Sequence, residues 1–209
     1  SVTIDGHKQF YMPMSCGMVY FRDPTILDVI AYHAHYVNRR GSVDLGIKSL
    51  SGSREANSLI LDSALKIMGS KGYALLIDHG IRTAAAFAEE IRQRPDFELV
   101  TEPVLNILTY RYCPANIQKS LGRKTQEDKC RINNDLNKVN RDLQRMQREA
   151  GHSFVSRTTL QGDRHCPEDM VVLRAVIMNP MTDMAVLREI LDEQQDIAAR
   201  FCTNDLPEA

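Results

Sequence analysis

Alternating apolar and polar residues predict six short strands along the chain. These strands are residues 1–5, 16–21, 98–101, 106–111, 153–160 and 171–178. The second is a compact apolar run typical of a buried strand, and it follows a turn around Pro13. Pro103 marks a turn between the third and fourth strands. The sixth strand is a nearly continuous apolar run, interrupted by Arg174.

Apolar residues at helical spacing predict five helices between these strands. They are a short helix over residues 24–32, a helix that Gly69 stops, helices over residues 72–92 and 128–150, and a final helix capped by Thr182 and Asp183. Over residues 33–50 the apolar positions follow neither the alternation of a strand nor the spacing of a helix, which predicts a long loop. Loops of that length are usually functional or mobile. Residues 118–127 are polar and predict irregular structure.

The helix over residues 128–150 carries one narrow apolar seam under a charged exterior. Ile132, Leu136, Val139, Leu143 and Met146 recur at alternating steps of four and three. Such a seam suits either a coiled-coil partner or the helix's own sheet. Because it covers only about two heptads, where a coiled coil needs three to four, packing on the chain's own sheet is favoured.

The order of elements predicts a mixed α/β chain in two parts. Residues 95–103 break the pattern, so we expect one domain over residues 1–95 and a second over 96–209. The sequence opens without Met on a strand already under way. We therefore expect a fragment whose preceding half lies elsewhere.

Composition narrows the class of protein. The chain has 209 residues with 26 basic and 27 acidic side chains, so its net charge of −1 argues against a nucleic-acid or membrane-surface binder. No apolar run approaches the ~20 residues that cross a bilayer, and no secretory leader is visible. Five dispersed cysteines indicate reduced thiols in a cytoplasmic protein. They are Cys16, Cys113, Cys130, Cys166 and Cys202.

Lys8 is the first candidate for chemistry. It follows the first predicted strand, beside His7 and the flexible Gly6. A lysine held on a rigid element can form a Schiff base if its site lets it lose a proton. The alternative is an ordinary surface lysine, which the His-Lys pair alone does not exclude.

Arg174 is the second candidate, because an arginine in an apolar strand needs a partner. A carboxylate bound by both prongs of the guanidinium is the favoured one. An internal salt bridge or a solvated side of the strand would explain it equally well.

Residues 51–54 (SGSR) open a helix with free backbone N–H groups and two hydroxyls, which can bind an anion. Ordinary capping by Ser51 or Ser53 is the simpler interpretation. His33 with His35, and His165 with Cys166, lack further ligands at zinc-like spacing, so no metal site is predicted.

Taken in order, these features resemble the group II pyridoxal-phosphate-dependent amino-acid decarboxylases. The strand ending in His7-Lys8, the run CGMVY and the helix start SGSR look like three successive family landmarks. The fourth landmark consists of GY, DH, PDFELV and EP, in that order, over residues 72–103. The fifth is LRAVIMNP over residues 173–180. Five landmarks in the right order cover nearly the whole chain.

The resemblance implies an aspartate-aminotransferase-like fold, with residues 1–95 ending the large cofactor-binding domain and residues 96–209 forming the small C-terminal one. It also implies roles for single residues. Lys8 would hold pyridoxal 5'-phosphate (PLP) as a Schiff base, with His7 by the phosphate. Ser51 and Ser53 would reach a phosphate across a dimer interface.

In the same family pattern, Arg174 would bind the substrate carboxylate, and Tyr36 in the loop would protonate the carbanion after carbon dioxide leaves. Tyr32 is close enough to compete for that role. The resemblance thus implies a homodimeric decarboxylase of glutamate, aspartate or 2,4-diaminobutyrate, completed by its own N-terminal half. The alternatives are a lyase or aminotransferase of the same fold, and a non-catalytic dimerisation module.

Overall fold

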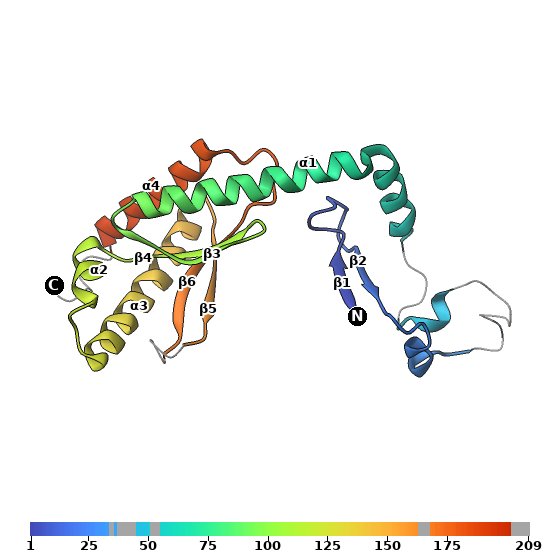
Figure 1. Cartoon of the computed structure of the whole chain (residues 1–209), viewed down its shortest axis with the longest axis horizontal. Coiled ribbons are helices and arrows are strands. Elements are labelled where there is room, and N and C mark those ends of the chain that lie inside the picture. Colours follow the sequence, from blue (N-terminus) through green and yellow to red (C-terminus); the bar gives the residue numbers. More distant parts are fainter. Residues whose placement is uncertain (34–35, 37–44, 51–54, 163–167, 202–209) are drawn as a thin grey trace. The chain divides into compact units, whose positions relative to one another are not determined.

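The computed structural model describes residues 1–33, 36, 45–50, 55–162 and 168–201 (Figure 1). The chain divides into two compact units, Ser1–Ala74 and Leu75–Ala209. This division lies inside a helix, upstream of the domain boundary expected at residues 95–96. That boundary stays a prediction.

In the first unit, β1 (Val2–Asp5) and β2 (Gly17–Tyr20) form an antiparallel hairpin in which Val2 pairs with Tyr20. The short 3₁₀ helices η1 (Ile26–Ile30) and η2 (Leu45–Lys48) follow. The expectation of a buried strand at residues 16–21 is wrong for β2, because Val19 and Tyr20 are 51% and 55% exposed. The described chain packs too little against β2 to cover its apolar side chains.

Helix α1 (Asn57–Gln93) joins the two units and is interrupted at Gly69. Gly69 has φ 62° and ψ 176°, a backbone conformation outside the helical region that glycine adopts at little cost. The two helices predicted on either side of Gly69 are therefore confirmed. Within the first unit, the Tyr73 hydroxyl donates to the Phe10 carbonyl at 3.2 Å, and the two rings pack edge to face.

The second unit contains an antiparallel sheet with the strand order β3-β4-β6-β5. The strands are β3 (Phe97–Val104), β4 (Ile107–Tyr112), β5 (Ser156–Leu160) and β6 (Met170–Val176), and all four were predicted. The turn predicted at Pro103 is wrong. Pro103 lies inside β3, an edge strand that tolerates proline, and the chain turns at Leu105, where φ is 57°.

Three further helices complete this unit: α2 (Ala115–Leu121), α3 (Gln126–Ala150) and α4 (Met184–Phe201). The irregular structure expected over residues 118–127 is wrong, since most of these residues belong to α2 or to the start of α3. Ile117 and Leu121, four residues apart, pack one side of α2 against Ile132 and Leu136. Gly151 ends α3 with φ 76°. Of the two caps predicted for the final helix, Asp183 is confirmed, because its Oδ1 accepts from two N–H groups of α4.

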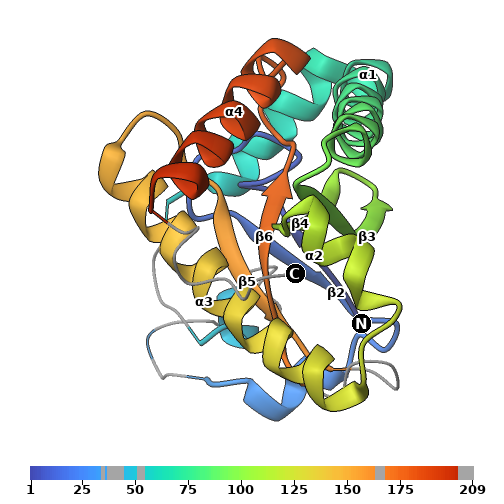
Figure 2. The ribbon, with the colours of Figure 1, turned by 90° about the vertical axis from the view of Figure 1, so that its left-hand side faces the viewer.

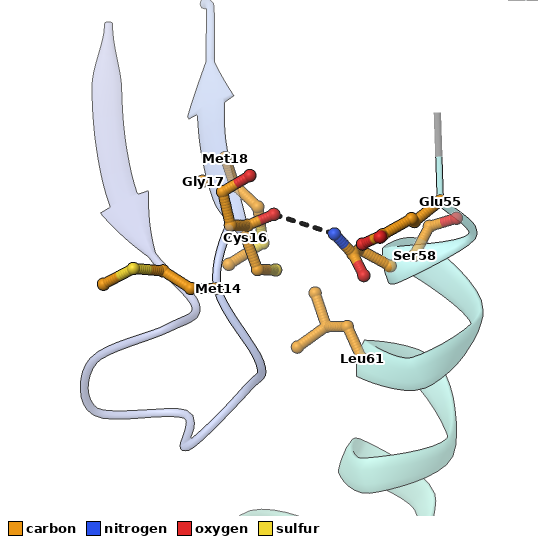
Figure 3. Close-up of a pocket in the computed structure, with 9 residues that line it drawn as sticks. Met14, Cys16, Gly17, Met18, Glu55, Ser58 and Leu61 are labelled. Carbon is orange, nitrogen blue, oxygen red and sulfur yellow. Dashed lines mark hydrogen bonds between the residues drawn. The ribbon is translucent and has the colours of Figure 1, made fainter. Parts of the chain in front are cut away.

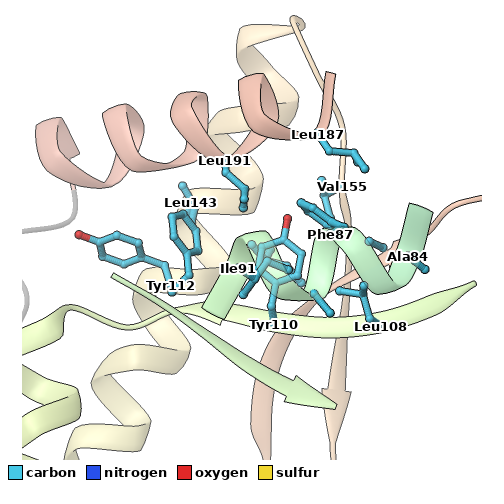
Figure 4. Packing of buried hydrophobic residues seen from close by; sticks show 14 of the residues in the cluster. Ala84, Phe87, Ile91, Leu108, Tyr110, Tyr112, Leu143, Val155, Leu187 and Leu191 are labelled. Atoms are coloured by element: carbon cyan, nitrogen blue, oxygen red, sulfur yellow. The ribbon is translucent and has the colours of Figure 1, made fainter. Parts of the chain in front are cut away.

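Helix α3 lies along β6 and α4 (Figure 2), and Val139 and Leu143 of its apolar seam belong to the main core, whereas Ile132 and Leu136 pack against α2. Val139 and Leu143 pack in one cluster with Phe87 from α1, Tyr110 from β4 and Leu191 from α4 (Figure 4). Packing of this helix on its own sheet is therefore confirmed. Among the described helices, none offers an apolar stretch long enough to cross a membrane.

Candidate functional site

Lys8 lies in the turn that immediately follows β1. Its Nζ is 2.5 Å from Asp5 Oδ2, three residues earlier, and 58% of its side chain is exposed. The hydrogen bond from Lys8 lowers the pKa of the Asp5 carboxyl, so the carboxylate is ionised at neutral pH. The amine is thus held near the strand end and stays accessible to a ligand.

His7 is oriented by the backbone of Cys16. Its Nδ1 lies 2.8 Å from the Cys16 carbonyl oxygen and 3.2 Å from the Cys16 nitrogen. The shorter distance favours a proton on Nδ1, which donates to the carbonyl. The turn is closed further by the His7 N–H, which donates to the same oxygen at 3.1 Å. Nε2 therefore remains as the ring atom for a second partner.

Gly6 permits this close approach. A Cβ at position 6 would lie 2.6 Å from Cys16 Sγ, closer than real Cβ contacts. Only glycine lets the turn after β1 pack against Cys16 while His7 and Lys8 follow directly. The flexibility first ascribed to Gly6 is in fact a requirement for space.

An open pocket of about 890 Å³ lies between the start of β2 and the start of α1 (Figure 3). Cys16, Glu55 and Leu61 line it, and Asn57 Nδ2 crosses it to donate to the Ser15 carbonyl at 2.8 Å. Neither Lys8 nor His7 is among its lining residues. This pocket reaches the turn through Cys16, whose backbone orients His7.

Arg174 lies on β6 between Thr109 of β4 and Ser156 of β5. Its guanidinium makes no ion pair with any residue that the structure describes, so the internal salt bridge considered from the sequence is not found there. Arg174 lines a pocket of about 290 Å³ with largely apolar walls and the polar residues Ser156, Asn179 and Thr182. A guanidinium in this setting is available to an anion.

The remaining candidates are less informative. Ser51 and Ser53 lie outside the described residues, as do His35, His165 and Cys166. Tyr36 and Tyr32 are 86% and 73% exposed. Their competing assignments as proton donor stay predictions. In the described part of the chain, no three potential metal ligands come together.

Lys8 and His7 are brought together at one turn, whereas Arg174 belongs to the second unit. Asp5 was not expected as part of the site. Its position three residues before Lys8 was visible in the sequence, but a carboxylate at the end of a strand gives no sign of its partner until the turn is known.

Two curated relatives are decarboxylases. The chain is 45% identical over 199 residues to an aspartate 1-decarboxylase of Aliivibrio fischeri, covering 95% of this chain and 36% of that protein. It is 25% identical over 209 residues to an L-2,4-diaminobutyrate decarboxylase of Rhizobium meliloti, covering 98% and 38%. The chain therefore spans little more than a third of the length of these relatives.

Solved structures share the fold. Mouse CSAD in its apo form matches with a TM-score of 0.75 at 21% identity, over 93% of this chain and 39% of that one. Oryza sativa TDC with PLP and tryptamine matches with a TM-score of 0.73 at 17% identity, over 96% and 39%. These likenesses confirm the expected aspartate-aminotransferase-like fold.

A family model described as "Pyridoxal-dependent decarboxylase conserved domain" matches residues 1–113, more than half of the chain. The match includes the turn with Lys8 and His7 and confirms the resemblance drawn from the sequence. The chain belongs to the pyridoxal-dependent decarboxylase family.

Proposed function

We propose that the complete protein containing this chain is a PLP-dependent L-amino-acid decarboxylase. The observation that carries the proposal is the Lys8 amine, which is exposed at the end of β1 and bound to Asp5. An accessible amine on a short, closed turn fits the aldehyde of PLP. When bound, PLP supplies an electron sink for the charge left at the α-carbon once carbon dioxide has gone.

Each residue of this chain then has a proposed task. Lys8 would hold the cofactor through its amine, and His7, fixed by Cys16, would lie by the cofactor phosphate. Arg174, whose guanidinium makes no ion pair with a described residue, binds a substrate carboxylate. Tyr36 delivers a proton to the α-carbon.

The assembly and the substrate are also part of the proposal. We propose a cytoplasmic homodimer in which Ser51 and Ser53 contact the phosphate across the interface, with the N-terminal half of the same enzyme completing the cofactor site. Aspartate is the first substrate to test, because the relative at 45% identity carries that activity in its name. Glutamate and 2,4-diaminobutyrate are the next two.

The test is borohydride reduction of the intact, cofactor-loaded protein, followed by peptide mass mapping. We expect a pyridoxyl mass on the peptide that contains Lys8. Lys8→Ala should lose both the label and the release of carbon dioxide. Lys66→Ala is the matched control, since Lys66 is another exposed lysine whose Nζ lies 2.7 Å from an aspartate on its own helix.

The outcomes separate the alternatives. An unlabelled Lys8 would leave the non-catalytic dimerisation module as the better interpretation. A labelled Lys8 with keto-acid formation in place of carbon dioxide would indicate an aminotransferase on the same fold.

A further inference from the structure

A second pocket lies entirely within the unit Leu75–Ala209. It has a volume of about 330 Å³ and is formed by the ends of β4 and α2, the first turns of α3 and the start of β6. Its apolar walls come from Leu121, Ile132, Leu136 and Met170. A largely apolar hollow of this size with a few polar groups is typical of a small-molecule site.

Arg111 is one of two buried polar groups that line this pocket, the other being Asn133. Arg111 is 4% exposed, and its Nε donates to Glu98 Oε2 at 2.6 Å while Nη1 donates to Asn133 Oδ1 at 3.0 Å. Two hydrogen bonds to different elements fix the plane of the guanidinium. Glu98 neutralises one positive charge here, so Arg111 contributes a directed donor rather than an excess of charge.

Lys129 supplies the excess charge. It is half-buried on the first turn of α3 and lines the same pocket. Within the ranges that the structure describes, no carboxylate pairs with its ammonium group. The pocket therefore carries two cations against one carboxylate, and that carboxylate, on Glu98, is not among the lining residues.

We propose that this pocket binds a short branched aliphatic carboxylate. Its carboxylate would meet Lys129 and Arg111, and its hydrocarbon tail would lie against the four apolar side chains. A dicarboxylate fits less well, since its second charge would be buried against an apolar wall without a partner. A bare phosphate would leave the apolar walls uncovered.

The site is independent of the decarboxylase chemistry, so it is tested on intact protein carrying Lys8→Ala. Isovalerate is titrated by calorimetry, with isoamyl alcohol as the uncharged analogue of the same shape. Carbon-13 labelling of methionine methyl groups reports on Met170 in parallel. We expect isovalerate to bind more tightly than the alcohol and to shift the Met170 signal.

Lys129→Ala should weaken isovalerate binding about tenfold, the effect of losing one charge-assisted contact. Lys129→Arg should restore most of it. Lys124→Ala is the matched control, because Lys124 is a half-buried lysine nearby that lines a different hollow.

Three results would overturn the proposal: equal affinity for acid and alcohol, isovalerate binding that Lys129→Ala does not change, or a silent Met170 methyl. Each can be read whether or not the protein proves to be a decarboxylase.

Discussion

The side-chain amide of Asn140 binds both backbone polar groups of Tyr112. Its Oδ1 accepts from the Tyr112 N–H at 2.8 Å, and its Nδ2 donates to the Tyr112 carbonyl at 2.9 Å. Tyr112 ends β4, two residues beyond the last pair that β4 makes with β6. Asn140 therefore takes the place of the missing neighbouring strand and connects α3 to the sheet.

Replacing Asn140 should destabilise the protein far more than replacing a neighbour on the solvent side. Asn140→Ala leaves two buried backbone groups without these partners, and we expect a loss of about 2 to 4 kcal/mol in the free energy of unfolding. Lys138→Ala, on the exposed side of the same helix, should change it by less than about 0.5 kcal/mol. Urea denaturation of the intact protein measures both, and equal midpoints would contradict the role given to Asn140.

The apolar seam of α3 could be predicted from the sequence, but the row of amides beside it could not. Asn133, Asn137, Asn140, Gln144 and Gln147 are buried and recur at the same steps of four and three as the seam. Asn137 and Gln144 also bond backbone groups near the ends of strands. Amides at helical spacing look like a solvated surface until the strand ends that they meet are known.

For the candidate site, too, the sequence indicated single residues but not the contacts that they make. Lys8 and Arg174 stood out only as a lysine after a strand and a charge in an apolar run, and the resemblance supplied their roles. The burial of β2 was predicted wrongly. Apolar side chains indicate that a strand can be buried, but they do not identify the segment that packs against it. The His7–Cys16 contact depends on the conformation of the turn, which the spacing of apolar and polar residues does not predict.

Gly80→Ala should destabilise the protein although alanine is the better helix former. A Cβ at position 80 would lie 2.9 Å from the Ile177 carbonyl oxygen, which is itself fixed by a hydrogen bond from Asn106 Nδ2 at 2.9 Å. Backbone must therefore shift, at a cost of about 1 to 3 kcal/mol. Gly72→Ala in the same helix meets only the flexible Met68 side chain and should gain up to about 1 kcal/mol. Thermal unfolding of both variants checks the opposite signs.

Arg174→Met should impair substrate binding without weakening the fold. Because the guanidinium makes no ion pair with a described residue, its removal leaves no carboxylate there unpaired, and the melting temperature should stay within about 2 °C. The KM for the amino acid should rise about 10- to 100-fold through the lost two-pronged contact. Arg157→Met on β5, an exposed arginine, is the control that should leave KM unchanged. A drop in stability without a change in KM would assign Arg174 a structural role instead.

Glu90 should make the stability of the second unit sensitive to acid. Hydrogen bonds from Arg188 at 2.8 Å and Arg94 at 3.3 Å lower the pKa of Glu90 in the folded protein, outweighing its partial burial. A carboxyl with a lowered folded pKa stabilises the fold above its unfolded value near 4.5, and that contribution disappears as the pH falls through the lower folded value.

Glu90→Gln should therefore be less stable than the parent at neutral pH, and the difference should shrink between about pH 5 and pH 3. Glu89→Gln is the matched control, because Glu89 is 65% exposed on the same helix and its pair with Arg92 is solvated. The test is to measure the urea midpoints of the parent and both variants across this pH range. If the gap between Glu90→Gln and the parent stayed constant with pH, the two arginines would not be stabilising the ionised form of Glu90.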